Sequence, residues 1–112
     1  MAQITYDDFA KVDIRVGRIV QADAFPQAKK PAYKLRIDFG PELGIKTSSA
    51  QITQHYQSAA LTDRLVLAVV NFPPRQIATF FSEVLTLGVI LGDGDIVLVQ
   101  PDRDVPLGTP IR

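Results

Sequence analysis

The segment from Tyr33 to Phe39 alternates strictly between apolar and charged residues, and no other stretch restricts the fold as tightly. Its odd positions are tyrosine, leucine, isoleucine and phenylalanine, and its even positions are lysine, arginine and aspartate. Successive side chains of a β-strand point to opposite faces. The segment is therefore predicted to be a strand with one face in a hydrophobic core and the other face charged.

Similar reasoning predicts several more strands. They are expected over residues 13–22, 45–49, 65–70, 80–87 and 96–99. In the first, Ile14, Val16 and Val20 share one parity, the residues between them share the other, and Gly17 is expected at a bulge or bend. The run from Leu65 to Val70 is apolar at both parities, so we expect it to be covered on both faces.

The remaining segments predict turns and little helix. Thr5 followed by Asp8 has the spacing of a capping box at the start of a short helical turn, and residues 52–60 are weakly helical. Short strands separated by Gly and Pro turns indicate a small all-β barrel. We predict a single domain over residues 1–112, folded as a five-stranded OB-fold barrel with short helical segments and N- and C-terminal extensions. An SH3-like barrel has the same pattern.

Composition excludes several classes of function. The 112 residues contain no cysteine, and twelve basic residues balance twelve acidic ones. Thiolate sites and disulfides are therefore excluded, and strong electrostatic binding to nucleic acid is disfavoured. Residues 1–46 nevertheless hold eight basic residues against six acidic ones, so a basic face remains open.

The chain lacks the motifs of catalysis. His55 is the only histidine and has no second metal ligand beside it, and no serine lies in a GxSxG turn. No phosphate-binding loop is present. We therefore predict a protein that is not an enzyme and uses no metal or cofactor. No apolar run approaches the ~20 residues that span a bilayer, which predicts a cytoplasmic protein without a leader or membrane insertion.

Apolar residues exceed what one small barrel is expected to hide. If Phe80 and Phe81 lie on one strand, their rings point to opposite faces and one of them stays outside the barrel. Exposed apolar patches commonly mark interfaces. We therefore expect a homodimer whose two chains build a groove for other polypeptides.

The segment after the strand at 65–70 is the first candidate binding site. Its two prolines, at 73 and 74, fix the backbone and would present neighbouring side chains with little loss of entropy. An ordinary turn explains the same residues equally well. The candidate peptide-binding residues are Asn71, Phe72, Pro73, Arg75, Gln76, Phe80 and Phe81.

A second candidate site is basic. Arg15, Lys34 and Arg36 occupy polar positions of two strands that we expect to pair, which would form a charged stripe on the barrel wall. Lys29 and Lys30 add a basic loop. A solvated outer face gives the same pattern.

Ordered motifs resemble a known family over nearly the whole chain. The opening Asp13–Gly17, which reads DIRVG, is similar to the signature strand of the tRNA-binding domain family, and Ser82–Glu83 follows in that family's order. The stretches at 30–35, 48–53 and 69–77 resemble the export-related chaperones within it. This resemblance implies an OB-fold homodimer that binds unfolded polypeptides or preproteins.

The alternative that the resemblance implies is binding of tRNA or other structured RNA. Its candidate residues are Arg15, Arg18, Lys29, Lys30, Lys34, Arg36, Ser82 and Glu83. Val84 and Leu85 stand where RNA-binding members typically carry Gly-Met, which favours the polypeptide.

Overall fold

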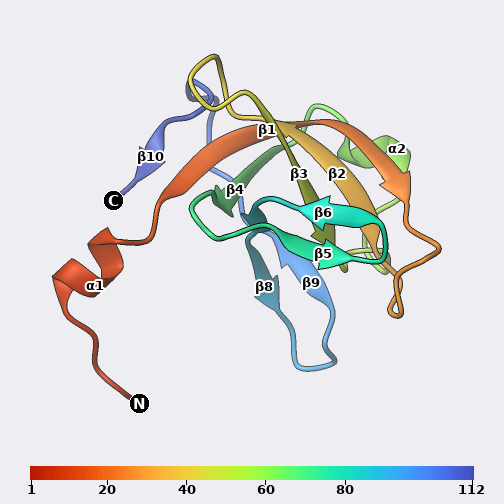
Figure 1. The fold of residues 1–112 in the computed structure, drawn as a ribbon, viewed down its shortest axis with the longest axis horizontal. Coiled ribbons are helices and arrows are strands. Elements are labelled where there is room, and N and C mark those ends of the chain that lie inside the picture. Colours follow the sequence, from red (N-terminus) through yellow and green to blue (C-terminus); the bar gives the residue numbers. More distant parts are fainter.

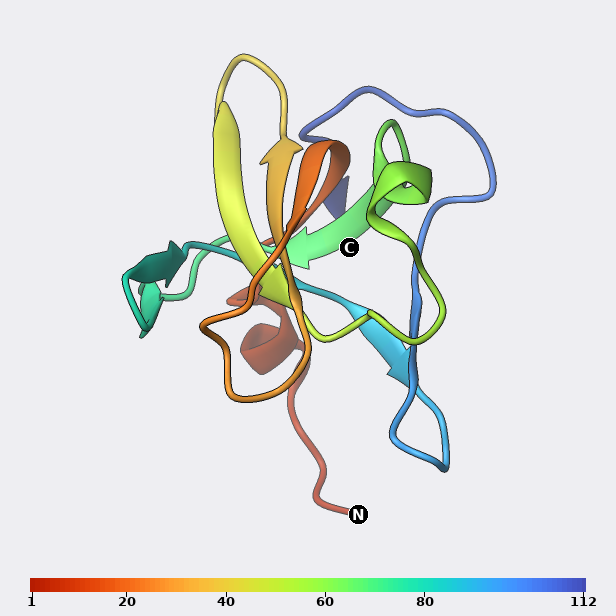
Figure 2. The ribbon, with the colours of Figure 1, turned by 90° about the vertical axis from the view of Figure 1, so that its right-hand side faces the viewer.

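A computed structural model describes residues 1–112 as an antiparallel β-barrel with two small hairpins outside it (Figures 1 and 2). Strands β3, β2, β1, β4 and β7 lie side by side in that order, and β10 pairs with β1. The elements are α1 (Tyr6–Ala10), β1 (Ile14–Ala24), β2 (Tyr33–Asp38), β3 (Ile45–Ala50), α2 (Ser58–Leu61), β4 (Leu65–Val69), β5 (Arg75–Ile77), β6 (Phe80–Ser82), β7 (Leu85–Thr86), β8 (Gly88–Ile90), β9 (Ile96–Leu98) and β10 (Pro110–Ile111).

The alternating segment forms β2, in the middle of the barrel wall. Leu35 and Ile37 are fully buried, whereas Arg36 between them is exposed. β2 pairs with β1 on one edge and with β3 on the other, so its core face lies at the centre of the sheet. The prediction of a strand with one core face is confirmed.

The bulge of β1 lies further along the strand than the position expected from Gly17. Val16 and Ile19 are buried, but Val20 is 38% exposed. The pairing of β1 with β2 shifts between Ile19 and Gln21, which is the register change of a β-bulge. The bulge therefore lies at Val20 rather than at Gly17.

Gly17 instead makes room for two core side chains. A Cβ at this position would lie 2.5 Å from Ile37 Cγ2 and 2.7 Å from Phe39 Cε1. We expect Gly17→Val to lower the free energy of unfolding by about 1–3 kcal/mol or more, because an added side chain overpacks the core. Chemical denaturation measures the loss. Gly92, where an added Cβ would meet no atom within 4 Å, provides the control Gly92→Val; equal losses in both variants would contradict the packing explanation.

The other predicted elements are partly confirmed. β4 is buried on both faces, as its apolar sequence indicates. Thr5 and Asp8 form the expected capping box, with Thr5 Oγ1 accepting from the Asp8 backbone. The helix expected over residues 52–60 was wrong in extent, because only Ser58–Leu61 is helical. The strand expected over residues 80–87 is split, and β6 leaves the barrel before β7 returns to it.

The barrel closes through backbone and side-chain hydrogen bonds between β3 and residues 81–86. The Glu83 backbone donates to Thr47 O at 2.8 Å, and the hydroxyls of Ser48 and Thr86 lie 2.8 Å apart. This seam completes a nearly closed OB-like barrel around a core that includes Phe39 and Leu61. None of the helices is long and apolar enough to cross a membrane.

Candidate functional site

The β5–β6 hairpin projects from the barrel (Figure 2), and two adjoining pockets lie against it. One has a volume of about 620 Å³ and the other about 400 Å³. They share Ser49 of β3 and Arg75 and Ile77 of β5. We call the two together the groove. The larger one is the basic pocket and the smaller one is the apolar pocket.

The apolar pocket is lined by the proline-containing segment at 72–75, which the sequence analysis gave as a candidate binding site. Phe72 and Pro73 form one wall, and Val84 and Leu85 form another. Phe72 is 54% exposed and Leu85 is 48% exposed, so both present apolar surface to solvent. Because the prolines at 73 and 74 restrict the backbone, this wall is formed before any ligand arrives. The pocket is suited to an aliphatic or aromatic side chain.

The basic pocket has three cationic side chains and no acidic one. Lys29 and Lys30 reach it from the loop between β1 and β2, and Arg75 lies opposite on β5. The amides of Gln27, Gln51 and Gln76 also line it. Such a lining favours a carboxylate or a phosphate, because cations without local counter-ions attract anions strongly.

The two phenylalanines of β6 occupy different surroundings. Phe80 packs edge-on against Phe25 with ring centroids 5.3 Å apart, and Lys34 Nζ lies 5.5 Å from the Phe25 centroid. Phe81 is 54% exposed on the other face of the hairpin. Neither ring nor Lys34 lines the groove. Their predicted binding roles stay predictions, at positions beside the groove rather than in it.

Ser82 and Glu83 use their polar atoms to close the barrel. Ser82 Oγ accepts from the Ser49 backbone at 3.0 Å. Glu83 Oε1 accepts from both the backbone and the hydroxyl of Thr47, at 3.1 and 3.0 Å. Both residues also border the apolar pocket. Their RNA-binding role stays a prediction, whereas the structure shows them hydrogen-bonded to β3 where the barrel closes.

The seam makes a testable prediction. We expect Glu83→Ala to lower the free energy of unfolding by about 1–3 kcal/mol, because the half-buried Thr47 N–H loses its acceptor. Glu83→Gln keeps an acceptor oxygen and should lose less. Urea denaturation compares the two variants, and an alanine variant as stable as the parent would show that the seam does not depend on this contact.

Among the predicted residues that lie away from the groove, Asn71 and Arg15 are held by the N- and C-terminal segments. Asn71 accepts from the Asp13 backbone at 3.0 Å and donates to Lys11 O at 2.7 Å, so it fastens the N-terminal segment to the end of β4. Arg15 binds Asp13 at 2.6 Å and Gly108 O at 3.0 Å. The hydrogen bond to Asp13 raises the pKa of Arg15, which therefore stays charged.

The predicted stripe of Arg15, Lys34 and Arg36 does not form. In the ladder between β1 and β2, Lys34 lies opposite Asp23 and Arg36 lies opposite Gln21. Arg15 lies at the other end of β1, between β4 and β10. Since β1 is eleven residues long, the same strand runs past two separate regions of the surface.

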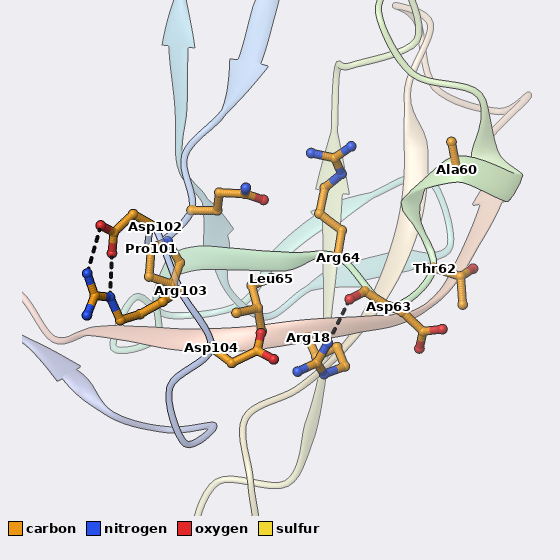
Figure 3. Close-up of a pocket in the computed structure, with 11 residues that line it drawn as sticks. Arg18, Ala60, Thr62, Asp63, Arg64, Leu65, Pro101, Asp102, Arg103 and Asp104 are labelled. Carbon is orange, nitrogen blue, oxygen red and sulfur yellow. Dashed lines mark hydrogen bonds and ion pairs between the residues drawn. The ribbon is translucent and has the colours of Figure 1, made fainter.

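Arg18 lies in a different cleft of about 480 Å³ (Figure 3). Its Nη1 donates to Asp63 O at 2.8 Å, and Arg103 is paired with Asp102 in the same cleft. Arg64 makes no such bond there, and its guanidinium lies 5.1 Å from the Tyr56 ring centroid. Three arginines and three aspartates line this cleft, so its charge favours neither a polyanion nor a polycation.

Sequence reasoning about sites missed several residues that line the groove. They are Gln27, Ser49, Gln51, Ile77 and Leu85. Ser49 and Gln51 reach it because β3 is antiparallel to β2, which brings the end of β3 beside the loop at 25–32. Ser49 and Gln51 could have been found from the sequence. A hairpin between the two predicted strands pairs Tyr33 with Ala50, which brings the end of the second strand beside the loop before Tyr33.

Comparison with known proteins gives one family match and several similar solved structures. The tRNA binding domain family matches residues 14–110. The crystal structure of the chaperone CsaA from Bacillus anthracis str. Ames is 48% identical, with a TM-score of 0.94 over 99% of this chain and 100% of that one. CsaA from Picrophilus torridus is 55% identical, with a TM-score of 0.91 over 98% of this chain and 100% of that one.

Longer proteins contain a related segment. The methionine–tRNA ligase of Pyrococcus abyssi is 34% identical over 97% of this chain, but the chain spans only 14% of that enzyme's length. The family match covers the barrel from β1 to β10, including the loops and the hairpin that enclose the groove. The chain therefore belongs to the tRNA-binding domain family.

Proposed function

We propose that the protein is a chaperone that holds unfolded polypeptide segments, preproteins among them, in the groove. The observation that carries the proposal is the pairing of a preformed apolar pocket with a basic pocket that has no acidic lining residue. An extended polypeptide offers apolar and charged side chains a few ångströms apart, which matches this arrangement. The whole-chain similarity to two CsaA chaperones supports the same function.

The groove suits transient binding. Phe72 and Leu85 are only half-covered, and a non-native client loses chain entropy when it docks. Affinity is therefore modest and acidic or neutral segments bind better than strongly basic ones, because Lys29, Lys30 and Arg75 repel cations. The activity is binding rather than catalysis, takes place in the cytoplasm and requires no cofactor.

Client binding is tested with one preprotein in two states. Fluorescence anisotropy compares a labelled preprotein kept unfolded by destabilising substitutions with its folded mature form. Saturable binding of the unfolded form alone is expected. Equal retention of both forms, or of neither, would remove the chaperone function.

We also propose that a second copy of the chain covers the β8–β9 hairpin. Val89 and Val97 are cross-strand partners and are 51% and 36% exposed, and Ile90 at the end of β8 is 75% exposed. Apolar groups clustered in this way on one projecting hairpin are typical of a subunit interface.

The dimer makes a direct prediction. We expect light scattering to give twice the chain mass of 12.3 kDa, and Val89→Asp with Val97→Asp to give the chain mass. The two aspartates place unpaired charges in the apolar interface, and burying them there opposes association. A parent protein that runs at the chain mass across micromolar concentrations would contradict the dimer.

Binding of tRNA is the second candidate function. Three cations in one acid-free pocket would accept phosphates, and the family match points to the same ligand. A mobility shift with bulk tRNA should then weaken steeply as salt rises, since each phosphate contact releases counterions. No shift at low salt would exclude it.

A further inference from the structure

Strand β5 has a free edge. It pairs with β6 through Arg75–Ser82, Gln76–Phe81 and Ile77–Phe80, and no strand lies along its other side (Figure 1). Alternate residues of an antiparallel ladder direct their backbone groups to opposite edges. Ile77 and Phe80 flank a two-residue turn, so their backbones hydrogen-bond to each other. The backbone N–H and C=O of Gln76 therefore point away from β6, toward the free edge. The backbone hydrogen bonds outside the regular ladders do not include Gln76.

The free edge runs along both pockets of the groove. Residues 75–78 form one wall of the basic pocket, and residues 27–30 form another. Phe72 and Pro73, which precede β5, line the apolar pocket. The apolar pocket thus lies toward the beginning of β5, and the basic pocket toward its end. Pro73 and Pro74 have no N–H, so a ladder on this edge ends at Arg75.

We propose that the groove takes its client as a short extended strand added to the free edge of β5. The client exchanges backbone hydrogen bonds with Gln76 and places an acidic side chain in the basic pocket and an apolar side chain in the apolar pocket. Residues i and i+2 of a strand lie on one face, about 6.5 Å apart, so both side chains enter the groove only at even spacing. This inference rests on the proposed function and specifies its geometry.

Strand addition explains how the site accepts unrelated sequences. Every polypeptide carries the same backbone donors and acceptors, whereas only the side chains differ between clients. Nucleic acid has no equivalent amide ladder, so the edge gives a polypeptide an advantage over RNA at this site. The three cations, without a lining carboxylate, select an acidic client segment.

Synthetic nine-residue peptides test the geometry. In an alanine and serine background, Leu and Glu are placed one, two, three or four residues apart, and anisotropy gives each affinity for the full chain. Spacings of two and four should bind about tenfold more tightly than spacings of one and three, since a good anchor contributes about that factor. N-methylation along the best peptide should weaken binding at alternate positions only.

Variants of the chain test the same contact from the other side. Gln76→Pro removes the outward N–H at a position where an edge strand tolerates proline. It should lower peptide affinity about tenfold, the loss expected for one unmade backbone hydrogen bond. Gln76→Ala keeps the N–H and removes only the side-chain amide, which donates to Ala78 O, so it should weaken binding much less than Gln76→Pro does. If Gln76→Pro fails to fold, the N-methylated peptides still decide the question.

The outcomes separate this inference from the proposed function. Peptides that bind with no dependence on spacing or N-methylation would overturn strand addition and leave the chaperone function standing. Failure of every peptide to bind, with tRNA occupying the groove instead, would overturn both. Alternation in both series is the result that supports the proposal.

Discussion

Phe39→Ala is expected to lower the free energy of unfolding by about 3–5 kcal/mol, the cost of a large cavity in a packed core. The Phe39 side chain is 1% exposed and belongs to the buried cluster with Leu35 and Leu61. It also fills the space that Gly17 leaves open beside β1. A domain of this size is stable by only about 5–15 kcal/mol, so the variant loses a large part of its stability.

The control for this cavity is the exposed phenylalanine of β6. Phe81 is 54% exposed, and Phe81→Ala should change the free energy of unfolding by only about 0.5 kcal/mol. Denaturant titration of both variants, extrapolated to water, measures the difference. A Phe39→Ala protein that loses less than about 1 kcal/mol would contradict this account of the core.

The second large effect concerns the groove. Phe72→Ala combined with Arg75→Ala should weaken binding of an unfolded client about 10- to 100-fold, because truncating an interface anchor costs about 1–2 kcal/mol. Phe72 supplies the exposed ring of the apolar pocket, and Arg75 is shared by both pockets. Neither side chain makes a hydrogen bond or ion pair within the chain, so the barrel should stay intact.

A matched double variant controls for general loss of surface. Tyr6, on α1, is an aromatic residue that is 74% exposed. Arg103 is a highly exposed arginine of the cleft around Arg18. Tyr6→Ala with Arg103→Ala removes an exposed aromatic ring and an exposed guanidinium outside the groove and should leave client affinity unchanged. Equal weakening by the two double variants would mean that the groove is not the client site.

Local patterns were sufficient for the parts of the fold that depend on local physics. The alternation around Leu35 predicts β2 because burial on one face is enough to fix a strand. The capping box of Thr5 likewise involves residues three positions apart. The bulge at Val20 was not predictable in this way, since a bulge arises from the register between two strands rather than from one.

The candidate site could be predicted only in part, for a similar reason. The rigid segment at 72–75 is visible in the sequence because proline restricts the chain locally. Its combination with Lys29 and Lys30 depends on the barrel bringing β5 beside the loop at 25–32. The surroundings of Asn71 were not predictable for the same reason, because its partners Asp13 and Lys11 are distant in the sequence.

The most direct test of the groove as a polypeptide site is an amide chemical-shift titration of the isotopically labelled protein with an acidic–apolar peptide. We predict saturable shifts gathered on Ser49, Arg75, Gln76 and Ile77, and on the loop that carries Lys29 and Lys30. Resonances of the cleft around Arg18 and Arg103 should stay in place. Shifts gathered on that cleft, or no saturable shift at all, would contradict polypeptide binding in the groove.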